Sequence, residues 1–557
     1  MYKIINNHFK NHFHKENIPA VARFDGPPRP LNRPLTTNEI TKTTSNMKNN
    51  KATFDTIPVE FVKYAPTCIH GEVARVLNNV FEKHEDIHLG EGVLIPLQKP
   101  KPKTIGPVKN LRPITLLATI RKILSRATTT RVAPKTNEYL SKSQSAYRLG
   151  RSTGDITWSY RWILAKVQEV EIKIYIIGID MSSAFDTIDR QKLVDIVESF
   201  LDEDEARIVR RLLSNTTIEV RVKGAETTPF ISNIGSPQGG SISGPLFEIY
   251  FENSLREVRS EIVKYEESQN IQKNETSLPD EMIYADDCDF LTMEVTTKQY
   301  VNENTDEILL QHNLLVNTDK TENTTLVRHV GKDSIEKEDW RKVKKLGSLL
   351  GDREDIARRK QLATSSLQKL SEIWRRNRRL KIRKKVQLYN ALVRTILLYN
   401  CGTWGMSQTD EDKMNSFHRK QLRHVLNIHY PYKITSKQLY KVTNTHPITP
   451  DITKSRWKLF GHTLRMDKDT PARRAMKFYF EERTEKKYRG RKRTTIVSTL
   501  NRDRAITKKK YPTFDLPLLQ SELDLHNMRV KAKDKRNWKK RVELVFKAAY
   551  SSKLKKL

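Results

Sequence analysis

The stretch Met282-Ile-Tyr-Ala-Asp-Asp-Cys-Asp-Phe-Leu-Thr292 places two adjacent carboxylates, Asp286 and Asp287, between two apolar runs. Ile, Tyr, Phe and Leu favour half-buried strands, whereas Asp tolerates the dihedral angles of a tight turn. The pattern therefore predicts a β-hairpin that holds a pair of acids at its turn. Such a turn can offer oxygen ligands to a divalent metal, although an Asp-Asp pair by itself is more often a solvated turn.

The charge of the chain favours a polyanionic partner. Its 557 residues include 101 Lys and Arg against 66 Asp and Glu, a net charge of +35. This excess suits nucleic acid, and the length predicts several domains. No run is apolar enough to span a membrane, and Met1–Glu16 lacks the apolar core of a signal peptide, so we expect an intracellular protein without membrane contact. Cys68, Cys288 and Cys401 are too widely spaced to indicate a zinc knuckle or a disulfide framework.

A third carboxylate follows a second apolar strand. Ile174–Ile179 has the composition of a buried strand and ends directly before Asp180. An acid there is costly to bury unless it is paired or bound to metal, and the alternative is a helix N-cap. The chain between Asp180 and Asp286 is long enough to hold helices, so the two strands can be neighbours in one sheet. Three carboxylates would then converge and hold two Mg²⁺ ions, about 3.5–4 Å apart, for an in-line phosphoryl transfer.

A glycine-rich loop, Gly235–Phe247, lies between these acids and precedes an apolar helical pattern. Closely spaced glycines allow a backbone to approach a ligand without interference from side chains. Gln238 in this loop is then free to contact a sugar or a base. The alternative is a plain turn.

Basic residues gather in two further segments. Arg148 and Arg151 lie beside Gly150 and before a helical pattern, where a guanidinium can donate two hydrogen bonds to a phosphate. The other group lies in or beside the edges of two predicted strands, where its members either contact phosphates or only solvate a loop. This group consists of Lys99, Lys101, Lys103, Lys109 and Arg112.

The N-terminal residues are polar and then rich in Pro and Arg, which predicts a linker or a partly ordered arm. His8, His12 and His14 lack Cys or acidic neighbours, so a solvated arm is favoured over metal binding. Thr36 and Glu39 have the spacing of a capping box, which predicts that the first ordered element begins at Thr36.

Six motifs follow one another in a characteristic order. They read Asn-Leu-Arg-Pro-Ile-Thr-Leu, Tyr-Arg-Leu-Gly-Arg-Ser-Thr, Asp-Met-Ser-Ser-Ala-Phe-Asp, Ser-Pro-Gln-Gly-Gly, Tyr-Ala-Asp-Asp and Asn-Thr-Asp-Lys-Thr-Glu, and begin at Asn110, Tyr147, Asp180, Ser236, Tyr284 and Asn317. This order resembles the reverse transcriptases of non-long-terminal-repeat (LINE-type) retrotransposons. The resemblance extends from Thr36 to Glu322.

The resemblance implies an α+β fold of the right-hand polymerase type, with fingers, a palm that carries an antiparallel sheet, a thumb, and then a helical basic C-terminal region. The implied divisions are a flexible arm over residues 1–35, fingers and palm over 36–330, primer grip and helical thumb over 331–430, and a basic nucleic-acid-binding region over 431–557. Lys344–Ser348 resembles the primer-grip hairpin. Trp374–Lys385 carries eight Lys and Arg in twelve residues, as expected of a helix that tracks a duplex backbone.

The resemblance also assigns roles to individual residues. Asp180, Asp286 and Asp287 would be the metal ligands, and Lys320 would act near the leaving pyrophosphate as a general acid or a fixed charge. Phe185 would exclude the 2′-hydroxyl of a ribonucleotide because a rigid ring would clash with it. The nucleotide-binding residues implied are Arg112, Phe185, Gln238, Gly239 and Tyr284.

Downstream, Leu398–Trp404, Phe417–Lys420 and Trp457–Met466 also look like the family's post-palm region, and His462 there is expected to pack or cap rather than bind metal. Arg483–Tyr511 and His526–Leu557 each hold twelve Lys and Arg against two acids, so they are expected to be nucleic-acid-binding arms or helices, with flexible tails as the alternative.

The expected function is RNA-directed DNA synthesis, in which a dNTP is added to a DNA primer 3′-hydroxyl on an RNA template, with two Mg²⁺ ions or with Mn²⁺. The segment before Thr36 leaves no room for an endonuclease domain, so target nicking is expected from elsewhere, or the sequence is a truncated copy. Synthesis on chromosomal DNA would take place in the nucleus. The alternative function is a catalytically inactive or domesticated remnant that only binds nucleic acid.

Overall fold

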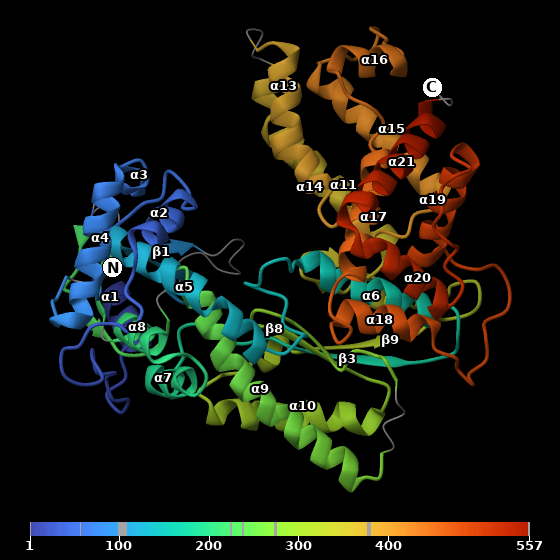
Figure 1. Ribbon diagram of the computed structural model, residues 1–557. Helices are drawn as coiled ribbons and strands as arrows, with labels where there is room; N and C mark the ends of the chain where they lie inside the picture. The colour runs from blue at the N-terminus through green and yellow to red at the C-terminus, as the bar shows by residue number, and fades with distance from the viewer. Residues whose placement is uncertain are drawn as a thin grey trace.

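The computed structural model describes residues 2–55, 57–87, 89–98, 108–214, 216–222, 225–236, 239–271, 276–375 and 380–554. Its architecture is mixed α+β. Figure 1 shows a central sheet, an N-terminal lobe on one side, and a helical lobe formed by the last third of the chain on the other. Among the described residues, no helix is both long and apolar enough to cross a membrane.

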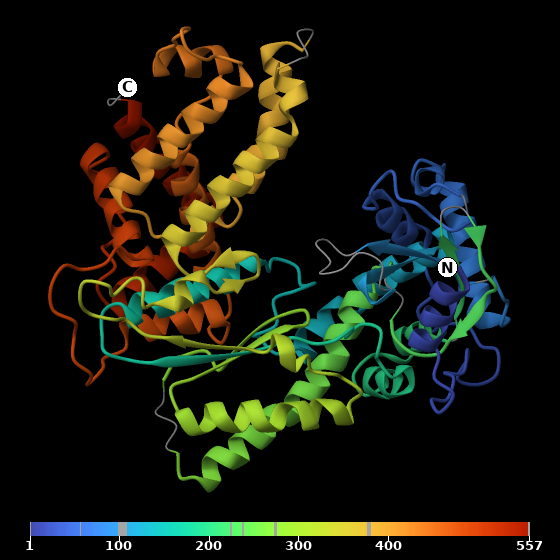
Figure 2. The ribbon, with the colours of Figure 1, turned by 180° about the vertical axis from the view of Figure 1, so that it is seen from behind.

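The central sheet has four antiparallel strands in the order β7-β8-β3-β9. Its strands are β3 (Ile174–Ile179), β7 (Glu281–Tyr284), β8 (Asp287–Thr292) and β9 (Glu322–Leu326). Figures 1 and 2 show helices on both faces of this sheet. They are α9 (Ser243–Ser268) and α10 (Val295–Gln311) on one face, and α6 (Thr153–Val167) and α18 (Pro471–Phe480) on the other.

Strand β3 is buried on both faces, as its apolar composition predicts. Ile177 and Ile179 belong to a core shared with α9 and α10, whereas Ile174 and Ile176 belong to a second core shared with α6 and the C-terminal helices. Successive side chains of a strand point to opposite faces, so one short segment joins both cores.

The N-terminal lobe contains the second sheet, in the order β2-β1-β4-β5, with β6 paired to β4. Its strands are β1 (Glu91–Gln98), β2 (Leu111–Leu117), β4 (Thr216–Val222), β5 (Ala225–Glu226) and β6 (Phe230–Ser232). Helices surround this sheet and connect the lobe to the central sheet. They are α2 (Thr37–Ser45), α3 (Val59–Lys63), α4 (Thr67–Glu82), α5 (Thr119–Tyr139), α7 (Arg190–Glu198) and α8 (Glu203–Leu213).

The first residues of the chain are ordered, unlike the flexible arm that the sequence predicted. Helix α1 (Tyr2–Phe13) buries Ile5, Phe9 and Phe13 in a core with apolar residues of β1, β4 and β6. Its His12 Nε2 lies 3.1 Å from Asp186 Oδ2. The polar composition concealed this helix because its buried residues, Ile5, Phe9 and Phe13, recur only at every fourth position, which is sufficient for one buried face.

The capping signal at Thr36 is confirmed at the start of α2. Thr36 Oγ1 accepts a hydrogen bond from the backbone N–H of Glu39 at 3.2 Å. The Glu39 carboxylate does not complete the box. It instead accepts two hydrogen bonds of 2.7 Å from the Arg131 guanidinium and so joins α2 to α5.

The helical lobe begins after a two-residue hairpin of β10 (Lys344–Lys345) and β11 (Ser348–Leu349), which agrees with the hairpin expected at Lys344–Ser348. Its first helices surround a core that contains Trp374, Tyr389 and Trp404. They are α11 (Asp352–Lys369), α12 (Ser371–Arg375), α13 (Ile382–Tyr389), a π-helical turn (Asn390–Arg394), α14 (Thr395–Leu397), α15 (Gln408–Val425) and α16 (Ser436–Thr443).

The C-terminal helices are part of the second core, which excludes the flexible-tail alternative for most of them. They are α17 (Thr449–Leu464), α18, α19 (Ile496–Lys510), α20 (Glu522–Lys533) and α21 (Lys535–Leu554). Trp457, Phe460 and Trp538 cluster beneath α6 residues of the same core. Gly461 permits this packing because a Cβ there would lie 1.9 Å from the indole Nε1 of Trp538.

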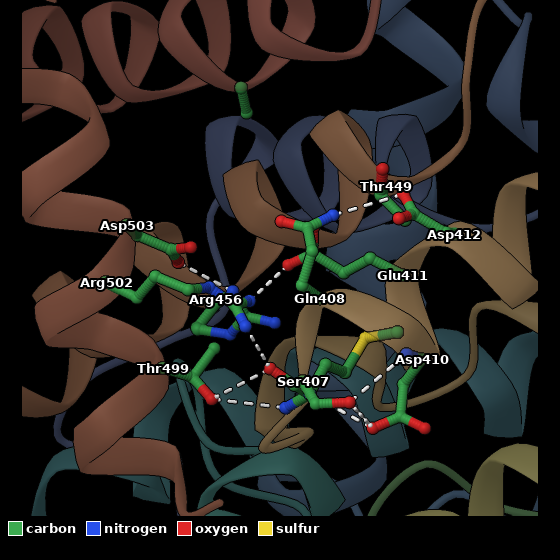
Figure 3. A network of polar contacts seen from close by, with 12 residues as sticks. Ser407, Gln408, Asp410, Glu411, Asp412, Thr449, Arg456, Thr499, Arg502 and Asp503 are labelled. Atoms are coloured by element: carbon green, nitrogen blue, oxygen red, sulfur yellow. Dashed lines mark hydrogen bonds and ion pairs between the residues drawn. The ribbon is translucent and has the colours of Figure 1, made fainter. Parts of the chain in front are cut away.

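A buried ion pair connects α17 to α19 (Figure 3). The guanidinium of Arg456 donates to Asp503 Oδ2 at 2.6 Å, and the indole N–H of Trp457 donates to the same oxygen at 3.2 Å. Arg502 extends the network to Glu411 on α15 and to the Met406 carbonyl. Both members of the Arg456–Asp503 pair are almost fully shielded from solvent.

We expect Asp503→Ala to lower the free energy of unfolding by about 3–5 kcal/mol because it leaves the Arg456 charge buried without a partner. Urea denaturation followed by tryptophan fluorescence measures this loss. The exposed Glu336 provides a control, since Glu336→Ala should change stability by less than about 0.5 kcal/mol. Equal effects of the two substitutions would contradict a structural role of the ion pair.

Candidate active site

The predicted hairpin with two acids at its turn is confirmed. Strands β7 and β8 pair antiparallel with Tyr284 opposite Asp287, which leaves Ala285 and Asp286 as the two turn residues. Ala285 has a φ of +57°, in the left-handed region that a tight two-residue turn requires. The turn therefore presents Asp286, and Asp287 begins the returning strand.

Asp180 lies at the same end of the sheet. Strand β3 pairs with β8 and its last residue, Ile179, is opposite Cys288, so the register continues with Asp180 beside Asp287. The N-cap alternative for Asp180 is wrong, because residues 181–188 form turns and the next helix, α7, is capped by Asp189. The three carboxylates predicted to converge therefore occupy one corner of the sheet.

Burial and mutual repulsion both raise the pKa values of carboxyl groups at this corner. Burial, together with the neighbouring charges of Asp286, Asp289 and Asp180, raises the pKa of Asp287 to about 6. Burial and the charge of Asp180 also raise the pKa of Asp286. The carboxyl groups of Asp286 and Asp287 are thus more costly to ionise than isolated ones.

Two cations moderate this negative charge. Lys320 Nζ lies 2.9 Å from Asp180 Oδ2, although the lysine side chain is 64% exposed and the pair is therefore screened by water. Arg112 on β2 and Lys320 both act to lower the pKa of Asp286. Two residues expected to bind phosphates thus lie near the carboxylates, and they come from the N-terminal lobe and from the segment before β9.

The carboxylates do not form a closed metal site. Among the described residues, no group of three or more His, Cys, Asp or Glu side chains has the arrangement of ligands around one ion. In this arrangement the Asp180 carboxylate is paired with Lys320. Its oxygens would have to exchange this cation for a metal ion.

Phe185, Tyr284 and Gly239 are the remaining nucleotide-site candidates among the described residues. The ring of Phe185 is half-buried and stacks on Phe247 of α9, with ring centroids 4.3 Å apart. Tyr284 is half-buried at the end of β7. Gln238 lies outside the described residues, as do Lys99, Lys101 and Lys103.

Only glycine fits at position 239, for a structural reason that the sequence did not reveal. A Cβ at this position would lie 2.1 Å from the carbonyl oxygen of Thr115, so the glycine lets the loop pass directly against strand β2. The close approach inferred from this glycine is therefore to another part of the chain in this structure. It fixes the loop between the N-terminal lobe and α9.

Gln144 holds the acidic turn and was not singled out from the sequence. Its buried Oε1 accepts hydrogen bonds from the backbone N–H groups of Ser145, Ala146 and Ala285 at 2.9, 3.0 and 3.1 Å. The segment at residues 143–145 also pairs with Ile283 of β7. One amide side chain thus satisfies the backbone of the turn that carries Asp286, and no sequence pattern announces this role.

The neighbouring Arg148 is used internally. Its guanidinium donates to the Asn137 side chain and to the carbonyl oxygens of Asn137, Ser141 and Gln144. The guanidinium that was a candidate for phosphate binding therefore supports the segment containing Gln144.

A second buried network lies at Asp289, two residues after Asp287 on β8. Asp289 accepts hydrogen bonds from Lys345 Nζ at 2.7 Å and from the Tyr160 hydroxyl at 2.5 Å. Lys345 belongs to the β10–β11 hairpin, whose turn carbonyls at Leu346 and Gly347 accept hydrogen bonds from Tyr399 and Arg358 of the helical lobe. The strand that begins with Asp287 is thus connected through one ion pair to the base of that lobe.

Residues 98–351 match the family of reverse transcriptases, or RNA-dependent DNA polymerases. Over 228 residues, or 40% of the chain, the sequence is 25% identical to an uncharacterized 149 kDa protein of transposon TX1 from Xenopus laevis. Over 208 residues, or 37% of the chain, it is 26% identical to a probable RNA-directed DNA polymerase from transposon BS of Drosophila melanogaster. These alignments span only 17% and 22% of the two proteins.

Two solved telomerase structures show a limited likeness. Apo telomerase from Candida tropicalis, truncated from the C-terminal domain, aligns with 44% of this chain and 51% of its own, at 16% identity and a TM-score of 0.32. Telomerase from Candida albicans, in complex with a fragment of telomeric RNA, aligns with 67% and 62%, at 12% identity and a TM-score of 0.33.

The raised pKa of Asp287 predicts a pH-dependent effect of removing its charge. The folded state favours the protonated carboxyl, so its contribution to stability is present below about pH 4 and is lost as the pH rises through about 6. Asp287→Asn should therefore stabilise the protein at about pH 8 in the presence of EDTA, by about 1 kcal/mol after allowance for solvent screening. Thermal denaturation between about pH 4 and pH 8 measures the difference, which should shrink toward the acid end.

The exposed Asp333 supplies the control for this experiment. Asp333→Asn should have no such pH-dependent effect. A constant difference between Asp287→Asn and the unsubstituted protein over this pH range would contradict the electrostatic explanation.

Proposed function

Because the chain carries a reverse transcriptase domain with weak similarity to proteins of non-LTR transposons, we propose that it is the RNA-directed DNA polymerase of such a retrotransposon. The observation that carries the proposal is the position of Asp180, Asp286 and Asp287 at one corner of the central sheet. A protein that only binds a polyanion has no physical need for three converging acids, since they would repel its ligand.

The donor set at this corner suits divalent cations. Carboxylate oxygens are the ligands that Mg²⁺ prefers. The raised pKa values of Asp286 and Asp287 reflect burial together with repulsion between the carboxylates, and bound cations would relieve that repulsion. Asp180, Asp286 and Asp287 would hold two Mg²⁺ ions, with Mn²⁺ as an alternative. When bound, such ions activate the primer 3′-hydroxyl and stabilise the departing pyrophosphate.

The chain's own residues would bind and orient the dNTP. Arg112 and Lys320 contribute positive charge beside the carboxylates, where the phosphates would lie. Lys320 would either protonate the leaving pyrophosphate or act as a fixed charge. Phe185, whose ring stacks on Phe247, would exclude a 2′-hydroxyl. Tyr284, Gly239 and Gln238 would complete the nucleotide site.

The lobes would then have the functions of a right-hand polymerase. The N-terminal lobe would be the fingers, the central sheet with α6, α9 and α10 the palm, and α11 to α15 the thumb. The β10–β11 hairpin would position the primer, because its Lys345 contacts Asp289 on the strand that begins with Asp287. The C-terminal helices would add basic surface for nucleic acid.

The partners of this activity are an RNA template, a DNA primer and dNTPs. We propose that synthesis takes place in the nucleus. The second candidate function, a catalytically inactive remnant, is favoured only by the basic surfaces, which a polymerase also needs.

Primer extension on an RNA template tests the polymerase function. We expect Mg²⁺-dependent DNA synthesis by the full chain, and we expect Asp286→Asn to reduce its rate by at least about 10³-fold, since the site would lose a metal ligand. The substituted protein should still bind RNA with an affinity that falls as salt rises.

The exposed Asp333 again gives the matched control, and Asp333→Asn should leave extension unchanged. Absence of Mg²⁺-dependent extension by the unsubstituted chain would contradict the proposal and favour the catalytically inactive remnant. Undiminished extension by Asp286→Asn would also contradict it.

Phe185→Val should relax the choice between deoxyribonucleotides and ribonucleotides. A smaller side chain leaves room for a 2′-hydroxyl, so the relative efficiency of rNTP incorporation should rise by about 10²-fold. Competition between dNTPs and rNTPs in the extension assay measures this ratio. If the ratio stays unchanged while dNTP incorporation persists, Phe185 is not the residue that excludes the hydroxyl.

A further inference from the structure

Two exposed tyrosines occupy the turn between α15 and α16. The Tyr432 backbone N–H donates to the His429 carbonyl at 2.9 Å and closes a four-residue turn. Tyr430 is 88% exposed and Tyr432 is 79% exposed, more than any other aromatic side chain in the described part of the chain. The fold therefore presents two large rings to solvent within one short turn.

Neither ring contributes to the fold. Within the described ranges, neither tyrosine side chain makes a hydrogen bond, an ion pair or a ring contact. By contrast, Tyr389 and Tyr440 of the same lobe are buried in its core. Single exposed apolar groups are ordinary on protein surfaces, but two exposed rings on one short turn indicate a surface that binds a partner.

The segment that contains the turn is basic and lacks acids. Residues 413–450 contain seven Lys and Arg and no Asp or Glu. Lys433, Lys437 and Lys441 are exposed on or beside α16. The adjacent α13, which contacts both α15 and α16, adds exposed Lys381, Arg383 and Lys384.

The combination of exposed rings with exposed cations favours nucleic acid over a protein partner. The fully buried centre of a protein interface is depleted in charged residues, and particularly in Lys. Nucleic-acid surfaces combine cations that contact the phosphates with aromatic rings on which bases stack. Because the faces of paired bases are hidden inside a duplex, exposed rings can stack only on unpaired bases.

We propose that Tyr430 and Tyr432 form a stacking platform for unpaired bases of a single-stranded nucleic acid, whose phosphates contact Lys433 and Lys437. Figures 1 and 2 place α13 and α16 at the end of the helical lobe that is far from the central sheet. The platform is thus remote from Asp286 and goes beyond the proposed polymerase function, which requires only a template–primer duplex at the carboxylates.

Equilibrium binding of labelled oligonucleotides to the full chain in EDTA tests the platform. We expect Tyr430→Leu and Tyr432→Leu each to weaken the binding of an oligo(U) or oligo(dT) of about 20 nucleotides by about 5- to 50-fold. Tyr430→Phe and Tyr432→Phe should bind like the unsubstituted protein, because a phenyl ring retains the stacking face. Binding of a duplex of equal length should change by less than about twofold.

Salt and base content separate stacking from charge. The Tyr→Leu variants should retain the slope of affinity against salt concentration, whereas Lys433→Ala and Lys437→Ala should each reduce it by about 0.7. A single strand of the same length without bases should bind the tyrosine variants and the unsubstituted protein equally. A preference for oligo(U) or oligo(dT) identifies RNA or DNA as the natural strand.

Normal binding by the Tyr→Leu variants, or equal losses for the duplex and the strand without bases, would overturn the stacking platform. Equal affinities of the Leu and Phe variants for the oligonucleotide would show that binding does not need the aromatic ring, and would also overturn it. Primer extension by the same variants keeps this result distinct from the polymerase proposal, since extension without tyrosine-dependent binding removes only the platform.

Discussion

Burial of strand β3 on both faces is the constraint on which the rest of the structure depends. Ile174 and Ile176 enter one core and Ile177 and Ile179 enter the other, so the strand tolerates no charge along its length. The first acid can appear only where the strand leaves both cores, at Asp180. The antiparallel register with β8 then sets Asp180 beside Asp287, and the two-residue turn of β7 and β8 adds Asp286.

Three acids at one corner repel one another, and the surrounding structure holds them in place. Gln144 binds the backbone of the turn through Ala285, and the Asp289–Lys345 ion pair connects β8 to the β10–β11 hairpin. Lys320 adds a screened positive charge at Asp180. The corner thus keeps ionisable groups in a high-energy arrangement, which is typical of sites where a cation or a substrate supplies the missing charge.

The parts predicted from the sequence were those encoded by local patterns. The acidic hairpin, the strand before Asp180, the cap at Thr36 and the hairpin at Lys344–Ser348 each follow from a few adjacent residues. Contacts between distant segments leave no such pattern. Gln144 reaches Ala285 and Lys345 reaches Asp289 only after the chain has folded, and the sparse apolar residues of α1 became a buried face only against the strands of the N-terminal lobe.

The C-terminal helices show why composition alone misjudged the end of the chain. Their many Lys and Arg side chains suggested arms or tails, yet Trp457, Phe460 and Trp538 complete the core that begins with Ile174 and Ile176. The region matched to reverse transcriptases ends at residue 351. The match therefore stops before the C-terminal helices that cover one face of strand β3. The buried Arg456–Asp503 pair also holds the C-terminal helices together, because it connects α19 to α17 beside that core. The basic residues therefore lie on helices whose apolar faces pack against the sheet. The C-terminal region thus shares one core with the strand that leads to Asp180.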